Sequence, residues 1–263
     1  MIADIVNHLN SSNLDLKMEG STAIYKCAFD QVTRDLVREA GGLEPLVAII
    51  KDKNIRDNKP LLIGATGAIW MCAASEYNVR KFDQLRTVNH LITLLNDESD
   101  DVLTNVAGAI AECVRFQNNR DILRNAHGLP ALVALLNSSH APLLENLAKA
   151  LKECAEDIES MRILEDLDAV RLIWSLLKNS NSRVQAYAAY AICPCVQNAN
   201  ESGELVRSLV GAMELVVGLL KSKDILVLSA VCAAIATIAK DTTNLAILTD
   251  LKVIYKLADL GKL

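Results

Sequence analysis

The chain has 263 residues, of which 51% are hydrophobic but only 4% aromatic, and it contains 11 glycines and 5 prolines. So small a share of aromatics and prolines argues against a sandwich or barrel of many short strands and favours stacked helices rich in Ala, Leu, Ile and Val. The 27 basic and 32 acidic side chains give a net charge of −5, which excludes a strongly basic nucleic-acid-binding protein. We therefore expect no nucleic-acid partner.

The N-terminal residues 1–8 include an aspartate and lack the basic start and apolar core of a secretory signal. Two long uncharged runs, 61–75 and 225–239, have 15 residues each, whereas about 20 apolar residues are needed to span a bilayer. Both runs therefore indicate buried helices. We expect a cytoplasmic protein with no membrane partner.

A six-residue motif recurs along the chain: Ala, then Ile or Leu, two variable residues, Cys, and finally Ala or Val. The copies begin at Ala23, Ala68, Ala109, Ala150 and Ala191, and a sixth begins at Ala234 with Ile238 in place of the cysteine. Successive copies are 45, 41, 41, 41 and 43 residues apart. Residues four apart share one helix face, so each copy predicts an apolar stripe on a helix.

A second apolar pattern, with hydrophobic residues at i, i+3, i+6 and i+7, repeats at the same period. It begins at residues 43, 88, 129, 170 and 213, and weaker copies begin at 2 and 251. Because two independent patterns agree on a period near 42 residues, the chain is expected to be an array of similar structural repeats.

Each repeat is expected to contain three helices. A short amphipathic first helix ends at Gly41-Gly42, Gly128 or Gly211, where glycine can adopt the left-handed conformation that stops a helix. The second helix carries the Leu stripe, and the long third helix carries the Ala/Cys motif. The extra residues of the 45-residue repeat lie in 51–59, a charged loop before the third helix.

Three helices in 41 to 45 residues resemble the armadillo repeat, and the resemblance covers essentially the whole chain. It implies an all-α, right-handed superhelical solenoid that forms one domain over residues 1–263. Five complete repeats are expected at about 30–240, with partial repeats at 1–29 and 241–263. Solenoid ends normally need polar caps, so exposed Ile254 and Leu257 would favour end-to-end self-association.

Within the armadillo class, residues 159–179, 193–199 and 231–241 resemble one family in particular. This is the armadillo-repeat subunit of the docking complex that attaches outer dynein arms to ciliary doublet microtubules. The match spans roughly repeats two to six, and the family continues through further repeats. The resemblance implies coiled-coil docking subunits, the outer dynein arm and the doublet microtubule as partners, in the axoneme of a cilium or flagellum.

The seven cysteines do not predict a metal or redox site. Five of them occupy the repeated motif position and are expected to be small buried side chains in a reducing compartment: Cys27, Cys72, Cys113, Cys154 and Cys195. Cys193 and Cys195 are two residues apart, which places them on different sides of a helix. Trp174 aligns with aliphatic residues of the other second helices, so it is expected in the core.

No catalytic, cofactor-binding or metal-binding arrangement is apparent. The four histidines lie at non-equivalent positions, without a Cys or carboxylate partner at zinc-site spacing. Neither a P-loop nor a Gly-x-Gly-x-x-Gly motif is present. We expect a protein that is not an enzyme and needs no cofactor.

The third helices of armadillo proteins line a concave groove that binds extended partner segments. The karyopherin-alpha family carries Trp and Asn four residues apart along this groove, and neither residue recurs at the matching positions here. The candidate groove residues are Glu19, Lys26, Met71, Asn105, Glu112, Asn146, Lys149, Glu153, Tyr187, Tyr190 and Thr237. Tyr is enriched in interface hot spots, so Tyr187 and Tyr190 are the leading partner contacts.

Two functions remain open. The first is a protein-interaction scaffold for outer dynein arm docking in motile cilia or sperm flagella, as the resemblance implies. The alternative is a general cytoplasmic armadillo adaptor that binds an extended peptide. In either case Glu112 and Glu153, which occupy the same position of adjacent third helices, are expected to face Lys or Arg of the partner, with Lys149 screening Glu153.

Overall fold

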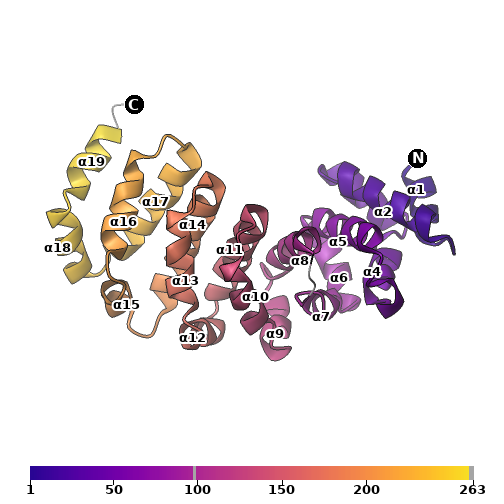
Figure 1. The fold of residues 1–263 in the computed structure, drawn as a ribbon, viewed down its shortest axis with the longest axis horizontal. Coiled ribbons are helices and arrows are strands. Elements are labelled where there is room, and N and C mark those ends of the chain that lie inside the picture. Colours follow the sequence, from indigo (N-terminus) through magenta and orange to yellow (C-terminus); the bar gives the residue numbers. More distant parts are fainter. Residues whose placement is uncertain (97–98, 261–263) are drawn as a thin grey trace. The chain divides into compact units, whose positions relative to one another are not determined.

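The computed structural model describes residues 1–96 and 99–260, and within these ranges every element is a helix and none is a strand (Figure 1). The residues cluster into two compact units, Met1–Leu132 and Val133–Leu263. The all-α fold class is confirmed. The extent of a single domain with five complete repeats stays a prediction.

The first unit contains two helices of a partial repeat followed by three-helix repeats. Its elements are α1 (Ile2–Leu9), α2 (Leu14–Cys27), α3 (Gln31–Glu39), α4 (Leu43–Lys51), the short 3-10 helix η1 (Lys53–Ile55), α5 (Lys59–Ala73), α6 (Glu76–Gln84), α7 (Thr87–Ile92), α8 (Asp100–Cys113) and α9 (Gln117–Asn125). The boundary between the units falls within α10 (Gly128–Ala134). Among these helices, α2, α5 and α8 are long third helices, and each packs on the next.

The second unit continues the same order of short, intermediate and long helices. Its elements are η2 (Leu135–Asn137), α11 (Ala141–Ala155), α12 (Ile158–Asp166), α13 (Ala169–Ser175), η3 (Leu176–Lys178), α14 (Ser182–Asn198), α15 (Ser202–Ser208), α16 (Ala212–Gly218), η4 (Leu219–Lys221), α17 (Ile225–Ile238), α18 (Thr242–Asp250) and α19 (Val253–Leu260). The third helices α11, α14 and α17 lie side by side in this unit (Figure 1).

Short polar side chains fix where the helices begin. Asp30 accepts a hydrogen bond from the backbone N–H of Thr33 at the start of α3, and Asn181 accepts from Val184 at the start of α14. Such a cap satisfies a helix N–H that has no partner within the helix, and losing it costs about 1 kcal/mol. At these helices the residue before the first turn marks where the helix starts.

A residue in the left-handed conformation separates the first and second helices of each repeat. The residues with positive φ are Gly41, Arg86, His127, Asp168, Gly211 and Lys252. The prediction was right for Gly41 and Gly211 but wrong for Gly128, because His127 takes the left-handed conformation there. Gly128 is small for another reason: a Cβ atom on it would lie 2.4 Å from Cδ1 of Leu123.

The motif cysteines lie in the core of four third helices. Cys72, Cys113, Cys154 and Cys195 are fully buried, and burial raises the pKa of the Cys113 thiol to about 12. Cys27 is exposed, so its expected burial was wrong. Cys72 lies near Arg34 of α3, the first helix of its own repeat, whereas the repeat of Cys27 contributes only α1 and α2 to this chain.

Two glycines bring the third helices of the first unit together. A Cβ atom on Gly67 would lie 2.5 Å from the ring of Tyr25, and one on Gly108 would lie 2.4 Å from the indole of Trp70. Each aromatic ring therefore rests on the bare backbone of the next third helix. Gly67 and Gly108 thus permit the close approach of these helices.

Buried asparagines in the first helices join neighbouring repeats. The side-chain amide of Asn78 donates to the carbonyls of Cys72 and Arg34, at 3.1 Å and 3.4 Å. In the second unit, Asn244 donates to the carbonyl of Gly203 at 3.3 Å. Both asparagines are fully buried, and each occupies the third position of its helix. Each ties its first helix to the first helix of the preceding repeat.

The last helix exposes apolar side chains, as expected for Ile254. Ile254 is 59% exposed and Tyr255 is 73% exposed, while Leu257 is only partly exposed. Self-association through this surface stays a prediction.

Replacing a buried motif cysteine by aspartate is expected to destabilise the fold. For C113D we expect a loss of at least about 3 kcal/mol at pH 7, because burial raises the carboxyl pKa by several units. The native-state pKa of the new carboxyl then lies above its unfolded value, so the penalty shrinks as the pH falls towards 4. C27D is the exposed control, and equal chemical denaturation curves for the two variants would contradict this packing.

Substituting Gly108 by alanine is expected to cost about 1–3 kcal/mol, since the methyl group overlaps the indole of Trp70. Intrinsic helix propensity alone predicts the opposite, a gain of about 1 kcal/mol. Gly218 is the matched control, because it has helical φ and ψ and no heavy atom lies within 4 Å of a Cβ placed there. Denaturant unfolding should show G108A less stable and G218A at least as stable as the wild type.

Candidate functional site

The exposed face of the third helices in the second unit carries a connected set of charged and aromatic side chains. We name it the charge–tyrosine cluster: Glu145 and Lys149 on α11, and Arg183, Tyr187 and Tyr190 on α14. Two nitrogens of Arg183 donate to the two carboxylate oxygens of Glu145, each at 2.8 Å. The Lys149 ammonium donates to Glu145 at 2.6 Å. One carboxylate thus holds two cations.

The two tyrosines extend this cluster towards α17. Lys149 Nζ lies 4.2 Å from the ring centroid of Tyr187, within the range of a cation–π interaction. The rings of Tyr187 and Tyr190 are tilted with centroids 6.4 Å apart, and the Tyr190 hydroxyl donates to the Ser229 hydroxyl of α17 at 3.0 Å. Side chains of three successive third helices therefore form one surface.

Glu145 controls the electrostatics of the cluster. Its side chain is only 14% exposed, and this burial by itself would raise its pKa. The hydrogen bonds from Arg183 and Lys149 outweigh burial, so the pKa of Glu145 lies below its ordinary value. The same contact raises the pKa of Arg183. Glu145 and Arg183 are therefore both charged near neutral pH.

In the first unit, the third-helix face is built from aromatic and amide groups. The Tyr25 hydroxyl of α2 donates to Oδ1 of Asn105 on α8 at 3.1 Å, across the intervening α5. The Asn105 amide donates to the carbonyl of Ile63 on α5 at 3.0 Å. Glu19 and Lys26 line a separate hollow of about 400 Å³ with Met18 and Pro60.

Three of the predicted groove residues are not surface groups. Asn105, Asn146 and Thr237 are buried, because the amide of Asn105 bonds between helices and the hydroxyl of Thr237 bonds back to the carbonyl of Ala233 at 3.0 Å. These three residues support the surface and cannot offer a partner an open side chain.

The remaining predicted groove residues are at least partly exposed. Glu112 pairs with Arg115 at 3.1 Å, and Glu153 pairs with Lys152 at 2.8 Å. Lys149 bonds to Glu145, so the cation found beside Glu153 is Lys152. Glu112 lies in the first unit and Glu153 in the second, and their adjacency stays a prediction.

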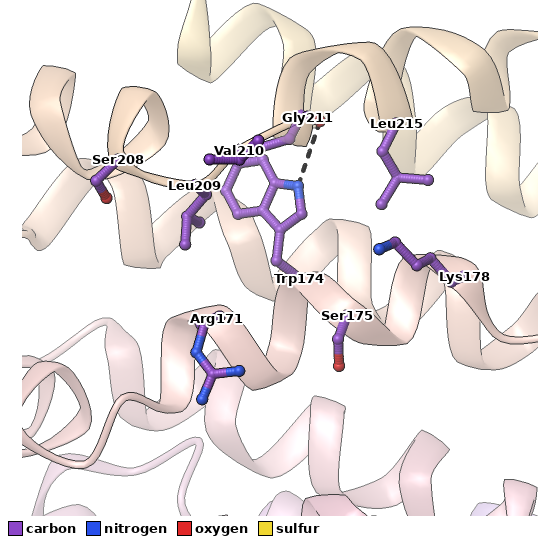
Figure 2. Close-up of a pocket in the computed structure, with 10 residues that line it drawn as sticks. Arg171, Trp174, Ser175, Lys178, Ser208, Leu209, Val210, Gly211 and Leu215 are labelled. Atoms are coloured by element: carbon purple, nitrogen blue, oxygen red, sulfur yellow. Dashed lines mark hydrogen bonds between the residues drawn. The ribbon is translucent and has the colours of Figure 1, made fainter.

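Sequence reasoning missed a pocket beside Trp174. The indole is 4% exposed, as predicted for a core residue, and its N–H donates to the carbonyl of Ala212 at 3.3 Å (Figure 2). One edge of the ring borders a cavity of about 480 Å³, which Arg171 and Lys178 also line. The fully exposed Val210 stands at its rim. The sequence signal that could have indicated this pocket is Val210, an apolar residue next to Gly211 in a turn.

Among residues 1–96 and 99–260, His, Cys, Asp and Glu side chains do not gather in groups of three that could hold a metal ion. In the described part of the chain, no helix has the length and apolar character needed to cross a membrane.

Comparison with known proteins agrees with this architecture. The model of the Armadillo/beta-catenin-like repeat matches residues 116–155, which contain one whole set of three helices from α9 to α11. A designed armadillo repeat protein in complex with peptide (KR)4 superposes with a TM-score of 0.76 at 22% identity, covering 90% of this chain and 99% of that one. The chain therefore contains an armadillo repeat at residues 116–155 and shares the fold of armadillo-repeat proteins.

Two curated relatives are much more similar in sequence. The chain is 83% identical over 260 residues to the armadillo repeat-containing protein gudu of Drosophila melanogaster. It is 57% identical over 261 residues to outer dynein arm-docking complex subunit 2 of Bos taurus. Each match covers 99% of this chain, but only 39% and 25% of the respective relatives. The chain therefore spans well under half the length of either protein.

Removing the Glu145 charge is expected to destabilise the second unit. E145Q leaves Arg183 and Lys149 without their shared carboxylate, so we expect a loss of about 1.5–3 kcal/mol at pH 7. Because the pKa of Glu145 is lowered in the native state, its contribution is present above the unfolded pKa, near 4.3, and is lost as the pH falls through the native value.

The matched control is E112Q, which removes a single contact to the exposed Arg115 and should cost less than about 1 kcal/mol. Thermal melts of both variants at pH 7 and below pH 4 would test this. If the difference in melting temperature between E145Q and the wild type is as large below pH 4 as at pH 7, Glu145 does not hold the two cations as an ionised carboxylate.

Proposed function

We propose that the chain acts as a non-enzymatic protein-interaction scaffold that helps to assemble or dock outer dynein arms on doublet microtubules. One observation carries the proposal: 57% identity, over 99% of the chain, to a bovine protein named as a subunit of the outer dynein arm-docking complex. The corresponding location is the axoneme of motile cilia or sperm flagella. The corresponding partners are coiled-coil docking subunits, the dynein arm and the doublet microtubule.

The third-helix faces supply the surface for such a role. The charge–tyrosine cluster offers partly exposed tyrosine rings beside fixed charges, a combination that is frequent in protein interfaces. Glu112 and Glu153 carry carboxylates on the same helix position, one in each compact unit. We propose that an extended partner segment presents Lys or Arg to these carboxylates and packs an apolar group against Tyr187 and Tyr190.

The arrangement sets a condition on the partner. Because Glu112 already pairs with Arg115 and Glu153 with Lys152, an incoming cation has to exchange with an internal one. The net gain from each exchanged surface pair is small, about 0–1 kcal/mol. Binding energy must therefore come mainly from the aromatic contacts, while the carboxylates select the charge of the partner.

The charge pattern is tested by reversing both carboxylates. The wild-type chain is expected to capture docking-complex components from an extract of ciliated tissue, and E112K/E153K should capture at least about fivefold less at low salt, because cations repel across both positions. The difference should narrow at high salt. The readout is quantitative mass spectrometry of the captured proteins, with circular dichroism to verify the fold.

The control is E76K/E214K, which changes the net charge equally on α6 and α16, outside the third helices. Equal loss with this control would contradict a specific site. Capture of other basic-peptide proteins without any axonemal component would favour the alternative, a general armadillo adaptor.

A further inference from the structure

The loop between the second and third helices of the first complete repeat is longer than the corresponding loops of the second compact unit. Residues 52–58 separate α4 from α5, whereas three residues, 179–181, separate η3 from α14, and three, 222–224, separate η4 from α17. The inserted loop is ordered by η1, whose Ile55 is buried. An insertion fixed in this way holds its polar side chains in defined places.

Arg56 attaches this loop to the second helix of the next repeat. Its Nη2 donates to the Thr93 hydroxyl at 2.9 Å and its Nη1 to the Thr93 carbonyl at 3.3 Å. The Thr93 hydroxyl in turn donates to the His90 carbonyl at 2.7 Å. The guanidinium is therefore held over the end of α7 by neutral groups rather than by a carboxylate.

A hollow of about 530 Å³ lies between the loop and α7. Its lining consists of Lys51, Lys53, Arg56, His90 and Thr93. Within the part of the chain that the structure describes, no acidic side chain lines it. Three cationic side chains and a histidine thus meet in a protein whose net charge is −5, and the volume falls in the range of ligand-binding clefts.

The three cations of the hollow lack a carboxylate partner among the described residues. Lys51, Lys53 and Arg56 form no ion pair with any residue in 1–96 or 99–260, and Nε of Arg56 is buried without a hydrogen-bond partner. The pKa of His90 is lowered, first by burial and then by the charges of Lys51 and Arg56. The charges of Lys51 and Arg56, which contribute to this lowering, favour an anion in the hollow.

We propose that this basic hollow binds an acidic peptide segment of a partner protein. The cations stand at separate chain positions, 51, 53 and 56, around a space that holds several side chains, so a run of Asp or Glu carboxylates matches it better than a single phosphate. The aliphatic stems of the lysines provide apolar walls beneath the charges. This site lies outside the third-helix faces and does not depend on the proposed role in dynein-arm docking.

The chain itself provides a matched control. Lys221 and Lys223 follow Leu220 as Lys51 and Lys53 follow Ile50, at the same end of a second helix. The repeat of Lys221 has the short loop, however, and the described residues that line its hollow include no Arg or His. K51Q/K53Q and K221Q/K223Q remove equal charge from exposed positions, so both variants should fold.

The experiment measures fluorescence anisotropy of a labelled oligoglutamate peptide with the whole chain at low salt. We expect K51Q/K53Q to bind about tenfold more weakly and K221Q/K223Q to bind like the wild type. R56Q should also weaken binding, and an oligoglutamine peptide of the same length should not bind. Equal weakening by both lysine pairs would overturn the proposal, since it would show non-specific attraction. Displacement of the peptide by inorganic phosphate, but not by chloride at equal ionic strength, would overturn it in favour of a phosphate site.

Discussion

The close approach of successive third helices within each compact unit is the constraint on which the rest of the structure depends. These helices meet along stripes of Ala, Cys and Gly, and helix axes can come as near as about 8 Å only where side chains at the contact are small. Cys113 and Cys154 are fully buried on this stripe, and Gly67 and Gly108 have no room for a methyl group. The larger Leu residues of the second helices then close the core from the other side.

This constraint explains how much of the fold could be predicted from the sequence. A period set by packing appears as a period in the residues, so the three-helix repeat and the core position of Trp174 were predictable. The exposure of Cys27 was not, because it depends on which neighbouring helices the chain supplies. The left-handed conformation of His127 was not predictable either, because a glycine, here the neighbouring Gly128, is the usual residue in that conformation. Gly128 is instead required because Leu123 leaves no room for a Cβ atom there.

The candidate site was less predictable because helix spacing leaves alternatives. Lys149 is four residues from both Glu145 and Glu153, and the spacing alone does not choose between them. The Glu-before-Lys order favours Glu145. On the next third helix, Arg183 binds the same carboxylate and the Tyr187 ring contacts Lys149, and both contacts favour the Glu145–Lys149 pair. Pairing between repeats, at Arg183–Glu145 as at Tyr25–Asn105, depends on how helices are stacked, which no local pattern encodes.

The buried asparagines have a consequence for how such an array can change. A one-residue slip between neighbouring repeats would strand the amide of Asn78 or Asn244 in the core, at a cost of about 1–3 kcal/mol for each orphaned group. Stacking is thus confined to discrete registers, and inserted residues must lie in segments that do not move such an amide away from its partner. The 52–58 loop is such a place. In this architecture, rigid contacts between first helices steer variation in length into one set of loops, where new surface chemistry can arise without disturbing the stack.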